Sequence, residues 1–406
     1  MSTRTFKSAK LRKAVKGAIG TTVAVPLLFA ALPVAAQGQI GNTTFEVDGY
    51  VKLDAWYDRE ADFGVSLLPS DIISADGLKY PGHPSYVNPA TGSQDHDGNF
   101  GTTAKQTRIR INTLTPTEVG DIKGYLEFDM YGASGSQDGN VRNRLAYFQW
   151  ENWTFGRAWS NFVNFNYGTT LNFAGPAGQT FARSEQVRYD ANLANGGTFG
   201  VALERNQDNY TVHGGSNENT SLPALTLSYT QPVGNSSFDV RGIVRQIEGE
   251  TAGGHEDSAL AWGVNAGTSV TLPNDTTTLM LTAAYGEGMG TYIYNPTMGS
   301  TGAYFDGDSL KRDKRWGAIG TISQKFTDQV TGNIVYGYSN GKFGINEEEI
   351  RGQSLGVNML YSPVDQLVFG AEYTRVWVKD KDGYLTGYDR ADGHANRVQF
   401  SAIYNF

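Results

Sequence analysis

The chain has 406 residues, and 39% of them are hydrophobic. Its net charge is −8, and it contains no cysteine. This hydrophobic content excludes a bundle of membrane-spanning helices, and the lack of cysteine excludes disulfides and thiolate chemistry. The 22 Tyr, 20 Phe and 50 Gly residues are not the composition of a disordered chain and favour a long antiparallel sheet.

The first 36 residues have the features of an export signal. Six basic residues precede the apolar stretch 18–32, and Val34-Ala35-Ala36 provides small residues at a cleavage site. These are the parts of a secretory signal peptide, so we expect residues 1–36 to be removed. The alternative is a membrane anchor, which two prolines and a length below the roughly 20 apolar residues of a membrane span disfavour.

Removal of this segment makes the chain more acidic. Of the 33 Lys and Arg residues, 27 remain against 41 Asp and Glu, which gives a net charge near −14. Nucleic acid is therefore not an expected partner, because proteins bind its phosphates with an excess of Lys and Arg.

Residues 37–406 form a single predicted domain in which apolar and polar residues alternate in sixteen segments. In the first segment, Val51 and Leu53 alternate with Lys52 and Asp54. Because successive side chains of a strand point to opposite faces, this pattern predicts an all-β fold, a transmembrane antiparallel β-barrel with lipid outside and a polar lumen. The alternation in 142–150 leaves its two faces ambiguous. The segments are 44–58, 103–114, 121–131, 142–150, 152–159, 184–191, 198–205, 222–230, 237–247, 259–271, 277–285, 314–325, 330–339, 351–361, 367–378 and 395–406.

The connections between these segments alternate between short and long. Seven are short and most of them carry Pro, Gly, Asn or Asp, as tight reversals require, whereas eight are long. Outer-membrane barrels have short periplasmic turns and long extracellular loops. The alternation thus implies an even strand number and both termini in the periplasm, with fourteen or eighteen strands as alternatives to sixteen.

The third long connection, 160–183, is predicted to fold into the barrel and to constrict the pore. A sixteen-stranded barrel encloses an aqueous lumen too wide to discriminate small solutes. This loop is rich in Asn, Phe and Gly. We expect Asn161 and Asn164 to offer neutral hydrogen-bonding groups and the phenylalanines to pack against the wall. An ordinary extracellular loop is the alternative.

The last strand carries a further signal. Val398, Phe400 and Tyr404 share its apolar face, whereas Arg397 and Gln399 share the polar one. A strand that ends on an aromatic residue at the C-terminus also resembles the sorting signal of bacterial outer-membrane proteins. We therefore expect the chain to lie in the outer membrane, in contact with its lipid.

Three motifs resemble those of a known family. They are GYVKLDA at 49–55, KGYLEFD at 123–129 and FGRAWSNF at 155–162, and they are similar to motifs of the DcaP-like porins of Gram-negative bacteria. The resemblance is best over 44–175. It implies a homotrimeric, sixteen-stranded outer-membrane porin that admits small anionic solutes, with dicarboxylates and aromatic dicarboxylates among them.

Selectivity in such a channel should depend on charges in its lumen. A guanidinium group is permanently charged and binds a carboxylate through two parallel hydrogen bonds, so arginines in a narrow pore would attract and orient an anion. Arg108 and Arg110 share a face, as do Arg142 and Arg144, and such ladders would let an anion pass between sites of similar affinity. The candidate pore residues are Arg108, Arg110, Arg142, Arg144, Arg157, Arg183, Arg188, Asn161, Asn164 and Lys52.

A second interpretation is that these arginines only neutralise acids of the same wall, among them Asp54, Glu127, Asp129 and Asp239. The open functions are an anion-selective porin, a general-diffusion porin, and a barrel enzyme or adhesin. An enzyme is disfavoured because all five histidines fall in predicted loops and no nucleophile motif is present. The acidic segment 95–99 lacks the distal Glu of a calcium loop, so neither a metal nor a cofactor is expected.

Overall fold

A computed structural model describes residues 36–59, 98–132, 139–206, 210–217, 222–294, 301–381 and 391–406. The predicted signal peptide lies outside these residues except for Ala36, and so does most of the acidic segment 95–99. Among the described residues, no helix is long and apolar enough to cross a membrane.

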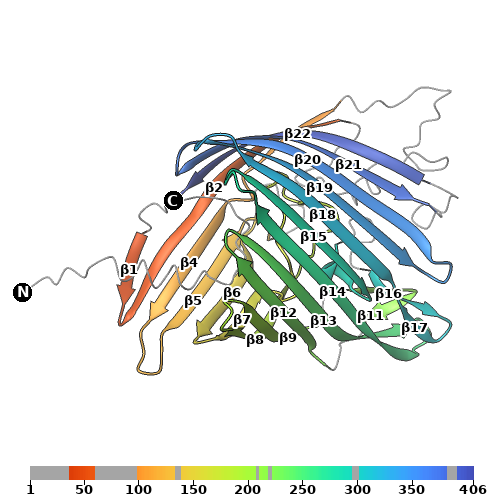
Figure 1. Cartoon of the computed structure of the whole chain (residues 1–406). Helices are drawn as coiled ribbons and strands as arrows, with labels where there is room; N and C mark the ends of the chain where they lie inside the picture. The colour runs from red at the N-terminus through yellow and green to blue at the C-terminus, as the bar shows by residue number, and fades with distance from the viewer. Residues whose placement is uncertain are drawn as a thin grey trace, which may run out of the picture.

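Sixteen strands of the described chain form a closed antiparallel barrel, which confirms the predicted fold and strand number. The first of them, β2, pairs with β4 on one side and with the last, β22, on the other, and this pairing closes the wall (Figure 1). The barrel strands are β2 (Thr43–Arg59), β4 (Arg108–Thr115), β5 (Ile122–Asp129), β6 (Arg142–Trp150), β7 (Trp153–Trp159), β8 (Arg183–Asn192), β9 (Thr198–Glu204), β12 (Ala224–Val233), β13 (Ser236–Thr251), β14 (Glu256–Thr271), β15 (Thr277–Glu287), β18 (Lys314–Lys325), β19 (Val330–Phe343), β20 (Glu348–Val364), β21 (Leu367–Asp380) and β22 (Ala391–Asn405).

Smaller elements extend this wall. A three-stranded sheet of β10, β16 and β17 lies at the end of the barrel away from the C-terminus (Figure 1). Two histidines expected in loops lie in strands, His213 in β10 and His394 in β22. The smaller elements are β1 (Ala36–Ile40), β3 (Asn99–Thr103), β10 (Thr211–His213), β11 (Gly215–Asn217), the 3-10 helix η1 (Gly290–Tyr292), β16 (Thr301–Asp306) and β17 (Ser309–Arg312).

One predicted strand is divided. The segment 103–114 was expected to be continuous, but β3 ends at Thr103 and β4 begins at Arg108. Between them the chain turns, with Thr107 N donating to Ala104 O at 3.0 Å. Both strands pair with β2, β3 with its long-loop end and β4 with its short-turn end.

The two faces of the wall follow the period-two pattern. On β22, Val398, Phe400 and Tyr404 are exposed on the outside, whereas Arg397 and Gln399 are buried on the inside. Exposed large apolar side chains lie on the outer face of strands around the barrel, as is typical of outer-membrane barrels.

A β-bulge explains the ambiguous phase of β6. Glu127 of β5 lies opposite Leu145, and the next residue, Phe128, lies opposite Asn143, so no residue of β5 lies directly opposite Arg144 in the strand register. An extra residue of this kind switches the face on which the following side chains lie. Arg142 and Arg144 therefore both face the lumen, although the residues after them follow the opposite alternation.

The short connections contain residues suited to tight reversals. Gly196 adopts a φ of 80° in the turn between β8 and β9, and Asp275 adopts 55° between β14 and β15. Gly and Asp or Asn tolerate this left-handed region better than other residues, and the predicted short turns are present where expected.

Candidate functional site

The connection between β7 and β8 lies inside the barrel. We name residues 160–182 the inward loop; most of its side chains are buried although it joins two strands of the wall. Its backbone N–H groups donate to wall side chains far away in the sequence. These bonds are Asn161 N to Glu204 Oε1 at 2.8 Å, Gly168 N to Thr321 Oγ1 at 3.0 Å, and Leu171 N and Asn172 N to Glu372 at 2.7 and 2.9 Å.

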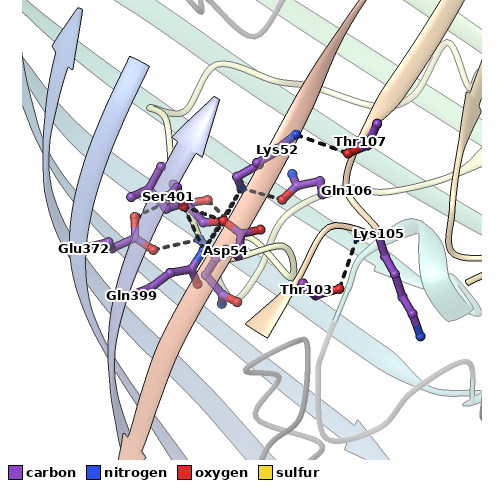
Figure 2. A network of polar contacts seen from close by, with 12 residues as sticks. Lys52, Asp54, Thr103, Lys105, Gln106, Thr107, Glu372, Gln399 and Ser401 are labelled. Carbon is purple, nitrogen blue, oxygen red and sulfur yellow. Dashed lines mark hydrogen bonds and ion pairs between the residues drawn. The ribbon is translucent and has the colours of Figure 1, made fainter. Parts of the chain in front are cut away.

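The tip of the inward loop is held by a buried polar network. Lys52 Nζ donates to Leu171 O at 3.0 Å and lies 3.2 Å from Asp54 Oδ1. Gln399 Nε2 donates to the same carbonyl at 2.9 Å and to Asp54. Figure 2 shows these side chains of β2 and β22 together with Glu372 of β21. Lys52 is only 3% exposed, so its charge faces the loop and not a solute.

The two candidate asparagines attach the start of the inward loop to β12 and β13, which lie a few strands further along the wall. Asn161 accepts from Ser228 Oγ through Oδ1 at 2.7 Å and from Arg241 through its carbonyl at 3.0 Å. Asn164 Nδ2 donates to Asp239 Oδ1 at 2.7 Å. Both residues are buried, and their polar atoms serve the attachment of the loop.

Four of the candidate arginines come together on one side of the lumen. We name Arg108, Arg110, Arg142 and Arg144, on β4 and β6, the basic wall. Its guanidinium groups share three carboxylates. Arg142 binds Asp129 through two hydrogen bonds of 2.9 and 2.6 Å, Arg144 reaches Glu127 and Asp129 at 2.7 and 2.9 Å, Arg110 reaches Asp48 at 2.8 Å, and Arg108 lies 3.7 Å from Glu127.

Arg183 lies beside this wall and forms no ion pair with any described residue. Its guanidinium group lies over the rings of Trp159 and Phe181, at 5.2 and 5.4 Å from their centroids, and within Coulombic range of Arg142 and Arg144. Five guanidinium groups thus stand against four carboxylates, the three that pair with the basic wall and Glu46 beside Asp48 on β2, which leaves an excess of one positive charge.

Aromatic rings accompany these cations. Arg108 lies over the ring of Tyr50 at 5.4 Å, and Arg142 lies over that of Tyr131 at the same distance. Tyr131 in turn stacks on Phe173 of the inward loop, with 4.1 Å between ring centroids. The sequence did not single out Tyr50 and Tyr131, since period two indicates their face but not their neighbours.

The structure places the other two arginines apart from this cluster. Arg188 faces the inside and pairs with Asp190 at 3.0 Å. Arg157 lies on the outer face, because Thr154 and Ala158 of the same strand are the inward residues, and it pairs with Glu185 at 2.9 Å. No described group of three or more His, Asp or Glu side chains is arranged to hold a metal ion.

The chain is similar to known outer-membrane proteins. The family described as DcaP outer membrane protein matches residues 85–406. The structure is similar to the outer membrane channel DcaP of Acinetobacter baumannii, with a TM-score of 0.78, 25% identity, and coverage of 92% of this chain and 100% of that chain.

Two further solved structures share the fold. OmpT of Vibrio cholerae gives a TM-score of 0.56 at 12% identity, over 92% of this chain and 100% of that chain. The anion-selective porin from Comamonas acidovorans gives 0.53 at 11% identity, over 90% and 100%. At these identities the likeness shows the fold alone. No sequence among curated proteins matches the chain.

Proposed function

We propose that this chain, which belongs to the DcaP outer membrane protein family and forms a channel in the outer membrane, passively admits small anionic solutes. The observation that carries the proposal is the excess of positive charge that the basic wall and Arg183 beside it form together. The inward loop, whose residues 160–182 include no Asp, Glu, Lys or Arg, lies in the same lumen. A constriction formed by an uncharged loop and a basic wall favours anions.

Partly exposed arginines supply the contacts that a carboxylate needs. The side chains of Arg110 and Arg142 are 29% and 30% exposed, against 6% for Arg144. Each can therefore keep its wall carboxylate and still present N–H groups to a passing anion. Two such groups favour a dicarboxylate over a single carboxylate.

The rings beside the arginines extend the proposal to aromatic carboxylates. Tyr50, Tyr131 and Phe173 offer apolar surface next to charge, so a benzene ring that carries carboxylates matches both features. This combination favours phthalate over succinate as a solute that binds during passage.

We also propose that the channel is a homotrimer. A solved structure of OmpT from Vibrio cholerae is described as a trimer form, and the fold is shared. Chemical cross-linking of the purified protein in detergent tests this assignment.

Single-channel recording in planar bilayers tests the proposed selectivity. Across a salt gradient, the reversal potential should show preference for the anion, and added phthalate should interrupt the current. Open current without ion preference and without block would instead indicate a general-diffusion porin. An enzyme or adhesin is the remaining alternative, and it would be favoured by a purified barrel that shows no conductance at all.

A further inference from the structure

A second connection also enters the barrel. Residues 289–294, which we name the inner limb, belong to the connection between β15 and β18 and include η1. Met289, Tyr292 and Ile293 have 0% exposure. They pack in one apolar cluster with Phe162 and Phe165 of the inward loop.

The inner limb pairs with the second half of the inward loop as a short antiparallel ribbon. Thr180 and Ile293 face each other across an isolated bridge. Backbone hydrogen bonds flank this bridge on both sides. They are Gly178 N to Tyr294 O at 3.2 Å, Tyr294 N to Gln179 O at 2.9 Å and Phe181 N to Tyr292 O at 3.3 Å.

Two buried arginines donate hydrogen bonds to backbone carbonyl oxygens at the start of the inner limb and just before it. Arg245 donates to Gly288 O through Nε and Nη2 at 3.3 and 2.9 Å, and Arg315 Nη1 donates to Gly290 O at 3.0 Å. Both side chains are about 1% exposed or less, so neither contacts a solute. Arg245 also lies between two rings, 5.0 Å from Tyr210 and 5.1 Å from Tyr292.

The charge of Arg315 is compensated by the buried carboxylate of Asp313 at 2.5 Å, whereas Arg245 forms no ion pair with a described residue. Burial of a guanidinium group carries a large desolvation penalty, and an apolar side chain of similar size would fill the same space without that penalty. The forked donors of arginine, however, fix carbonyl oxygens in direction as well as distance.

We infer that Arg245 and Arg315 are positioning residues for the pore. They hold the inner limb, the inner limb holds residues 178–181 of the inward loop, and the inward loop sets the width of the lumen. The inference rests on the proposed function, since it assumes that the inward loop limits conduction.

The first test is Arg245→Met, recorded in planar bilayers beside the unaltered channel. Without the hydrogen bonds from Arg245 to Gly288 O, the inner limb should be held less firmly. The open conductance should then rise, and closing events should become severalfold more frequent. Folding is checked by the shift in gel mobility on heating. Arg351→Met is the matched control, because it removes the same charge but Arg351 pairs with Glu349 near the start of β20. A folded Arg245→Met channel with unchanged conductance and closing frequency would overturn the inference.

A disulfide cross-link tests whether the effect of Arg245→Met comes from the position of the inner limb and not from a loss of stability of the barrel. The chain has no cysteine, so Thr180→Cys with Ile293→Cys introduces a single pair. Opposed residues of an antiparallel pair have Cα atoms about 4.5–5.5 Å apart, which a disulfide spans. Oxidation of this pair in the Arg245→Met channel should restore the original conductance and closing frequency, and a reducing agent should abolish the rescue.

The same pair keeps the inference testable if Arg245→Met does not fold. In the otherwise unaltered channel, oxidation should lower the closing frequency below that of the reduced form, and equal frequencies would contradict the inference. Failure of the proposed function can be distinguished from this outcome, because the unaltered channel itself would then show no anion preference or no conductance.

Discussion

Lys52 Nζ lies 3.0 Å from the carbonyl oxygen of Leu171, and this hydrogen bond joins the first barrel strand to a loop tip 119 residues later. The same ammonium group neutralises Asp54. One buried cation therefore couples the closure of the barrel to the position of the inward loop.

Replacement of Lys52 by Met should destabilise the barrel and release the loop tip. Removal of one partner of a buried ion pair costs about 3–5 kcal/mol, because it leaves an uncompensated charge. Urea unfolding in detergent measures this loss. The double variant Lys52→Met with Asp54→Asn should recover part of it, and no recovery would show that the packing of the lysine stem, not its charge, is what matters.

Replacement of Gly337 by Ala should narrow the channel. A Cβ atom at this position of β19 would clash with Ala177 O, so the inward loop must move into the lumen. Such overpacking costs about 1–3 kcal/mol, and single-channel conductance should fall.

The control for this variant is Gly320→Ala on the neighbouring β18, where a Cβ atom would meet nothing within 4 Å. Its conductance should equal that of the unaltered channel. Equal conductance of both variants would show that the loop yields without narrowing the lumen.

Replacement of Arg142 by Gln should weaken anion preference. Asp129 keeps Arg144 as its partner, so the fold should persist while the basic wall loses one positive charge. Because hydrogen bonds to charged groups contribute roughly 1.5–3 kcal/mol, the affinity for a blocking phthalate should fall about tenfold or more. The change in reversal potential should be larger at low salt, where charges are screened less.

Arg157→Gln is the matched change for this experiment, since Arg157 lies on the outer face with Glu185. It should leave reversal potential and block unaltered. An equal effect of both variants would mean that the charge of the whole barrel, and not the basic wall, determines selectivity.

A charge on the lipid-facing wall should reveal the position of the membrane. Leu281 is 54% exposed on the outside of β15, and Arg at this position should destabilise the barrel by about 2–4 kcal/mol if it lies at the bilayer midplane. Val233 lies beside a short turn, where the same change should cost about 0–1 kcal/mol. Refolding into lipid vesicles at increasing urea measures both, and equal costs would contradict this placement.

The sequence by itself determined the wall of this protein. Period two is a local property, so it indicated the sixteen strands, the lipid face of β22 and the shared faces of Arg108 and Arg110 without knowledge of any partner. The alternation of short and long connections added the even strand number, and the loop at 160–183 could be recognised from its residues alone as rich in Asn, Phe and Gly.

Only the tertiary structure decided what the polar groups of the lumen contact. Glu372 receives the N–H groups of the inward loop from residues about 200 positions away, which depends on the register of every intervening strand pair and on barrel closure. The bulge at Arg144 and the outward position of Arg157 are likewise results of strand pairing. The inner limb was not foreseen because its buried position follows from contacts with another loop, and such contacts have no periodic signal in the sequence.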